Sequence, residues 1–113
     1  MVSKIDWNVL EQSRSEGAAH KRLKRRAVKI LELAGAHSTV LEAKAPGIKG
    51  RVDVAGYWPS VTVAIECGKT PAGRIEGLRT HYDVVVHLPY CWTPKFFPDR
   101  VLARKIDDEI WRR

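Results

Sequence analysis

Two acidic residues, Asp53 and Glu66, stand in neighbouring apolar segments of the chain. Residues 51–56 and 61–66 each alternate between apolar and other side chains, which is typical of β-strands, and the short link between them predicts an antiparallel hairpin. Side chains at paired positions of a hairpin share a face. The alternation therefore places both carboxylates on one side of the hairpin and the valines and isoleucine on the other.

The pairing depends on the length of the loop. If the loop spans residues 57–60, Asp53 lies opposite Ala64 and Glu66 lies opposite Arg51. Two acids flanked by small alanines leave room for a hard cation, and magnesium accepts a couple of carboxylates while keeping water for a phosphate substrate. The pattern predicts a Mg²⁺ site, with Mn²⁺ as a substitute. The alternative is that the acids pair with Arg51 and Lys49 on an exposed face.

A lysine close to such a site could orient or deprotonate the attacking water while the metal stabilises charge on the phosphate. Lys69 follows Glu66 by three residues, and Lys44 lies on the preceding predicted strand. Either lysine could serve, or the lysine function has been lost.

The arrangement Arg-Val-Asp-Val at 51–54, followed by Val-Ala-Ile-Glu-Cys-Gly-Lys at 63–69, resembles the PD-(D/E)XK nuclease superfamily. The expected element order over Ser15 to Leu88 is also similar to the α-β-β-β-α-β core of that superfamily. The resemblance implies Asp53 and Glu66 as metal ligands, Cys67 as donor of a backbone carbonyl to the metal, and Lys69 as the catalytic lysine.

Two positions depart from the superfamily pattern. Val52 stands where proline is frequent, and Gly68 occupies the position where the lysine usually stands, so that Lys69 comes one residue late. A glycine at the end of a strand permits a bulge that could turn the next side chain inward.

The first helix adds an acid and a histidine. Glu16 and His20 extend the stripe formed by Leu23 and Ala27, so both are expected to point toward the sheet, where a polar group needs a partner. Glu16 resembles the first-helix acid that many members of the superfamily place near the metal, and we treat it as a catalytic candidate. Otherwise Glu16 complements the helix dipole, and His20 is a polar residue at the edge of the core.

The sequence predicts an α/β (α+β) fold in which helices flank a mixed sheet. We expect one domain over residues 1–113, with an arm or short helix at 1–14, a core at 15–88 and a Pro-rich segment with a last helix at 89–113. The predicted elements are a helix from Ser15, the N-cap, to Ala34; strands Ser38–Lys44, Arg51–Gly56 and Val61–Glu66; a short helix within Thr70–Tyr82; a central strand Asp83–Leu88 buried on both faces; and a helix carrying Leu102, Ile106 and Ile110.

Charge indicates the partner. Twenty Lys and Arg against thirteen Asp and Glu give a net charge of +7, which favours a polyanion such as DNA. The expected phosphate contacts are Lys21, Lys24, Arg25, Lys49 and Arg51.

The cellular compartment is predicted from the cysteines and from the apolar segments. The two cysteines are expected to be reduced, and neither a signal peptide nor a membrane-spanning segment is expected. We therefore expect a cytoplasmic protein, including the host cytoplasm if a virus encodes it. Scarce Asn and Gln suggest a hot habitat.

These features predict a Mg²⁺-dependent DNA endonuclease. A chain this short is expected to recognise the shape of DNA rather than its sequence. It is similar in size, charge and element order to small archaeal and viral Holliday junction resolvases of DNA recombination and repair, which implies a homodimer. Two alternatives stay open: a degenerate relative that only binds DNA, and a protein-interaction module.

Overall fold

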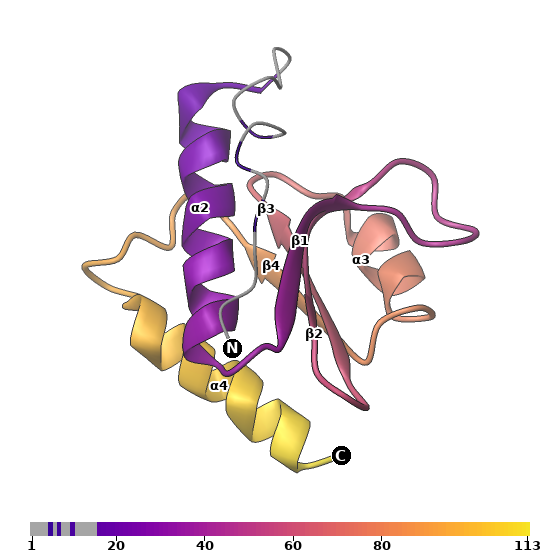
Figure 1. Cartoon of the computed structure of the whole chain (residues 1–113). Helices are drawn as coiled ribbons and strands as arrows, with labels where there is room; N and C mark the ends of the chain where they lie inside the picture. The colour runs from indigo at the N-terminus through magenta and orange to yellow at the C-terminus, as the bar shows by residue number, and fades with distance from the viewer. Residues whose placement is uncertain (1–4, 6, 8–9, 11–15) are drawn as a thin grey trace.

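The computed structural model of the chain describes residues 5, 7, 10 and 16–113. Its elements follow the predicted order of one helix, three strands, a helix, a strand and a last helix (Figure 1). They are α2 (Ala18–Leu33), β1 (Ser38–Ala43), β2 (Val52–Tyr57), β3 (Thr62–Cys67), α3 (Ala72–Leu78), β4 (Val84–Leu88) and α4 (Asp99–Trp111). The predicted α+β class with a mixed, helix-flanked sheet is confirmed.

The sheet has the strand order β1-β2-β3-β4, in which only the β3–β4 pair is parallel. The prediction that residues 83–88 form a central strand was wrong, because β4 pairs with β3 alone and forms an edge. Its first four residues are half-buried and only Leu88 is fully buried. A continuous apolar run is typical of a central strand, but this edge strand is also covered on both faces, with Val84 and Val86 against the core beneath α2 and α4 and Val85 against the core beneath α3.

The β2–β3 register also differs from the prediction. Ala55 pairs with Ala64, because the backbone N–H of Trp58 bonds to the Val61 carbonyl at 2.8 Å and closes a tighter turn than expected. The predicted partners of Asp53 and Glu66 were therefore wrong by two residues. Continued one pair beyond Val54–Ile65, the observed register brings the two acids opposite each other.

Helices cover both faces of the sheet (Figure 1). Helices α2 and α4 pack on one face, around buried side chains that include Leu31, Val63 and Ile106. Helix α3 covers the other face, where Leu78 packs with small sheet residues such as Ala64. The domain thus has three layers, and both sides of the β2–β3 hairpin lie inside it.

Helix α2 forms where apolar residues recur at helical spacing, and it buries Leu23, Ala27, Ile30 and Leu31 against the sheet. It ends before Gly35, whose φ of +93° suits glycine. It begins at Ala18, after Gly17, so Glu16 lies just before the helix rather than in it. The predicted N-cap, Ser15, lies outside the described residues.

Most of the predicted N-terminal arm also lies outside them. Of its described residues, Leu10 is buried and Ile5 packs against the core, while Trp7 is exposed. Within the described part of the chain, no helix combines the length and apolar character that a membrane span requires.

Candidate functional site

Charged side chains from two helices and three strands meet at one end of the sheet, where β1 and β3 finish and β2 begins. Helix α2 starts at the same end, and its first turns pack against this end of the sheet. The site is therefore built where the strands can offer both backbone and side-chain groups to the helix.

A buried lysine occupies the middle of this site. Lys24 is 0% exposed, and its Nζ lies 2.5 Å from Glu16 Oε1, also donates to Glu42 Oε1, and lies 3.8 Å from Asp53 Oδ1. The ammonium group thus faces three carboxylates, from the segment before α2, from β1 and from β2. A buried charge persists only with such partners.

Asp53 connects the sheet to the helix. Its Oδ2 accepts a hydrogen bond from the Cys67 backbone N–H at 2.8 Å, and its Oδ1 lies 3.3 Å from His20 Nε2. The expectation that Glu16 and His20 turn toward the sheet is confirmed, because both approach Asp53 or its partners.

Glu66 is buried, but its carboxylate is held differently. Its Oε2 accepts the Asp53 backbone N–H at 2.9 Å, while its Oε1 pairs with the Arg74 guanidinium of α3. Arg74 also donates to the carbonyls of Lys49 and Arg51, at 2.7 and 2.6 Å. The structure therefore brings the two predicted acids together through the backbone, while their carboxylates bind different cationic residues.

The ligand atoms that converge are those of Glu16, His20 and Asp53, which lie within 4.8 Å of one another. Two carboxylates and an imidazole form a donor set that divalent metals such as Mn²⁺ accept. Glu16 Oε2 is buried and has no hydrogen-bond partner among the described residues, an acceptor that a cation would satisfy. These residues therefore fit a divalent ion, although Glu66 and Cys67 of the predicted ligand set do not belong to this group.

Neither predicted lysine lies in the site interior. Lys69 and Lys44 are both exposed. Gly68 has a φ of +80°, so the strand end does turn as a glycine permits, and its carbonyl accepts a 2.5 Å hydrogen bond from His87 Nε2. The ammonium group among the carboxylates is that of Lys24.

Tyr90, in the loop after β4, closes the site beside the glycine. Its hydroxyl lies 3.2 Å from His20 Nδ1, and a Cβ added to Gly68 would meet its ring at 2.8 Å. Because one imidazole nitrogen faces Tyr90 and the other faces Asp53, the tyrosine fixes the orientation of His20.

The charges shift one another's protonation. Burial acts to lower the pKa of Lys24, but the hydrogen bonds and charges of Glu16, Glu42 and Asp53 outweigh it and raise the pKa above the usual 10.5. Burial acts to raise the pKa of Glu16, but Lys24 and His20 lower it below the usual 4.5. Burial, together with Asp53 and Glu66, raises the pKa of the Cys67 thiol, so this thiol stays neutral.

Of the predicted phosphate contacts, Arg25, Lys49 and Arg51 are exposed and Lys21 is half-buried. Arg51 stands at the rim of the site, with its Nη1 3.4 Å from the Glu42 carbonyl. The assignment of Lys24 to this surface was wrong, because its side chain is directed into the carboxylates.

Four site residues were missed or misplaced by sequence reasoning. Lys24 had a readable signal, since it continues the four-residue spacing of Glu16 and His20. Glu42 was not among the predicted site residues, and its φ of +54°, rare for a non-glycine residue, is visible only in the structure. The roles of Arg74 and Tyr90 follow from tertiary contacts that no local pattern announces.

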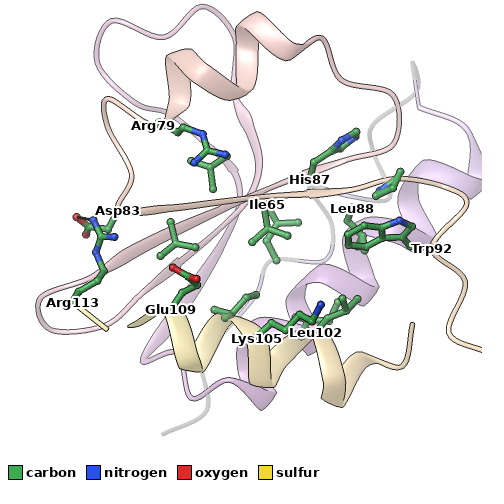
Figure 2. A pocket seen from close by; sticks show the side chains of 16 residues that line it. Ile65, Arg79, Asp83, His87, Leu88, Trp92, Leu102, Lys105, Glu109 and Arg113 are labelled. Atoms are coloured by element: carbon green, nitrogen blue, oxygen red, sulfur yellow. Dashed lines mark hydrogen bonds and ion pairs between the residues drawn. The ribbon is translucent and has the colours of Figure 1, made fainter. Parts of the chain in front are cut away.

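A separate groove of about 600 Å³ lies between β4 and α4 (Figure 2). Apolar side chains such as Ile65 and Leu102 line its floor, and Asp83, Glu109 and Arg113 lie at one end. None of the clustered carboxylates lines this groove, so the groove is separate from the candidate metal site.

Comparisons of the chain with protein-family models, with curated proteins and with solved structures found no match.

Proposed function

We propose that this chain is a metal-dependent DNA endonuclease that hydrolyses phosphodiester bonds and selects branched DNA, with Holliday junction resolution as the specific activity. The observation that carries the proposal is the convergence of Glu16, His20 and Asp53 beside a buried ammonium group in a chain of net charge +7. Clustered, partly buried charges of this kind are typical of active sites.

Glu16, His20 and Asp53 would hold the divalent ion, Mg²⁺ or Mn²⁺, and the ion would supply positive charge to the phosphate. The chain's own residues orient these ligands. The Cys67 N–H fixes Asp53, Tyr90 fixes His20, and Arg74 holds Glu66 against the backbone of Asp53.

The rim supports the choice of DNA as substrate. Arg51 and Lys49 are exposed on the loop that Arg74 ties to Glu66, so they lie where a phosphate backbone would approach the site. Contacts to phosphates read shape rather than bases. A homodimer, as in the resolvases that the sequence resembles, would bring two such sites to a four-way junction.

The donor set also predicts the metal preference. Imidazole suits Mn²⁺ better than Mg²⁺, which prefers oxygen ligands. We therefore expect faster cleavage with Mn²⁺ than with Mg²⁺ and none with EDTA.

The test incubates purified protein with a labelled four-way junction, a linear duplex and a single strand, each with Mg²⁺, Mn²⁺ or EDTA. Paired, metal-dependent nicks confined to the junction are the expected result. Asp53→Asn keeps an oxygen for the Cys67 N–H but loses a charge, so cleavage should fall by at least about 100-fold while DNA affinity stays within about threefold. Asp108→Asn, on the exposed side of α4, is the control. Cleavage by Asp53→Asn at the wild-type rate would sink the proposal.

A degenerate, DNA-binding relative is the second candidate. Lys24 and Arg74 already form ion pairs with Asp53, Glu16 and Glu66 without a metal, which is the observation in its favour. The double variant Asp53→Ala/Glu66→Ala separates the two. If the wild type does not cleave DNA, and if the double variant binds DNA as tightly as the wild type with or without metal, the result would favour the binding protein.

A further inference from the structure

We propose that Lys24, delivered from α2, supplies the functional ammonium group of the site in place of Lys69 and Lys44. This inference rests on the proposed nuclease function. It assigns the role of the lysine to a residue of α2, whereas the sequence pattern assigns it to Lys69 or Lys44.

The position of the ammonium group carries the inference. Lys24 Nζ stands 2.5 Å from Glu16 and 3.8 Å from Asp53, the two carboxylates of the converging ligand group. Lys69 and Lys44 are exposed, and they follow directly after Gly68 and after the last residue of β1. Of these three lysines, Lys24 is the one whose ammonium group lies among the described carboxylates of this group.

A purely structural ion pair explains the arrangement less well. One carboxylate is enough to form an ion pair with Lys24, but three carboxylates from different segments surround its ammonium group. One of them, Glu42, adopts a left-handed φ of +54° inside a strand. Such backbone strain costs about 1–3 kcal/mol and gathers at functional sites. The chain thus accepts both a buried charge and a strained residue to hold this ammonium group in place.

The role follows from a fixed positive charge. In hydrolysis, the oxygen of water bonds to phosphorus, one bridging P–O bond breaks, and the proton released by water is balanced by the proton that the leaving oxygen takes up. Negative charge grows on the phosphoryl oxygens during this exchange, and the buried positive charge of Lys24, behind Glu16 and Asp53, stabilises it electrostatically without direct contact while staying protonated throughout. Glu16 and Glu42 fix the position of this positive charge.

The experiment compares Lys24→Met with Lys69→Met, and with Lys95→Met as an exposed control outside the site. Each variant is measured for junction cleavage, DNA affinity, Mn²⁺ binding by electron paramagnetic resonance, and thermal melting. We expect Lys24→Met to lose cleavage by at least about 100-fold. Its DNA affinity should change less than about threefold, and Mn²⁺ should bind more tightly because a competing positive charge is gone. Lys69→Met should cleave within about threefold of wild type.

Loss of cleavage in Lys69→Met with retention in Lys24→Met would overturn the inference and leave the nuclease standing. A wild type that neither cleaves nor binds Mn²⁺ would overturn the nuclease itself. If Lys24→Met does not fold, Lys24→Met/Glu42→Gln removes opposite charges together and takes its place. Failure of both variants to fold would assign Lys24 a structural role alone and end the proposal.

Discussion

At the scale of single residues, the site is a set of charges that depend on one another. Lys24 is buried at the cost of its hydration, and Glu16 and Glu42 compensate by direct contact. The same contacts lower the pKa of Glu16 and raise that of Lys24. Each shift links the free energy of unfolding to pH.

The two shifts act on opposite sides of neutrality. Because the pKa of Glu16 is lowered in the folded state, its contribution is present above the usual 4.5 and is lost as the pH falls below that value. Because the pKa of Lys24 is raised, its contribution is present below 10.5 and is lost as the pH rises beyond it. The network therefore stabilises the fold most between these limits.

Glu16→Gln tests the acid side. We expect a loss of about 1 kcal/mol in the free energy of unfolding near pH 7, and a smaller loss at pH 3.5, because Glu16 of the unfolded wild type is protonated below its usual pKa of 4.5 and part of the contribution is then lost. Thermal melts over pH 3 to 7 measure the difference. Glu76→Gln, at an exposed ion pair with Arg79, serves as the control and should change little at any pH. A pH-independent difference between wild type and Glu16→Gln would contradict this account.

Sequence reasoning found some of these residues and not others, for a physical reason. The orientation of Asp53, Glu16 and His20 follows from strand and helix periodicity, which depends only on local geometry. Lys24 was grouped with the surface lysines because composition makes burial of a lysine improbable. Arg74 could not be found, since its partners lie on β3 and in the loop before β2, which meet only in the folded sheet.

At the scale of elements, the ends of β3 and β4 set the geometry of the site. Gly68 bonds through its N–H to the Leu88 carbonyl, and Tyr90 lies directly over it. Element types followed from periodicity, but the β2–β3 register did not, because one hydrogen bond at Trp58 changes the turn. The edge position of β4 likewise depends on which strand it pairs with, and composition does not specify that.

Gly68→Ala tests this arrangement. The new methyl group would meet the Tyr90 ring at 2.8 Å on a backbone with φ +80°, so we expect a loss of about 1–3 kcal/mol in the free energy of unfolding. Displacement of Tyr90 should also release His20 and weaken Mn²⁺ binding. Denaturant titration and Mn²⁺ titration measure the two effects.

Gly73→Ala provides the matched control. Gly73 lies in α3 with nothing within 4 Å of its added Cβ, so alanine there should leave the fold unchanged or stabilise it by up to about 1 kcal/mol. Equal effects of the two substitutions would show that Tyr90 does not pack over Gly68 as described.

At the scale of the whole molecule, the net charge of +7 is divided between the rim of the site and other surfaces. Arg51 and Lys49 are anchored through their carbonyls to Arg74, which fixes the loop that presents them. Arg104 and Lys105 are exposed on α4, which packs on the opposite face of the sheet from α3. Total charge predicts attraction to DNA, but only the position of each cation decides which of them neutralises a phosphate.

The salt dependence of DNA binding separates these surfaces. Each neutralised phosphate contributes about 0.9 to the slope of log affinity against log salt concentration. Lys49→Ala/Arg51→Ala should therefore weaken binding at low salt and reduce the slope by about 2, whereas Arg104→Ala/Lys105→Ala should leave it unchanged. Fluorescence anisotropy with one junction at several salt concentrations measures both slopes. A reduced slope only in the α4 variant would place the DNA on α4, away from the carboxylates, and cleavage at Asp53 would then require a different approach of the strand.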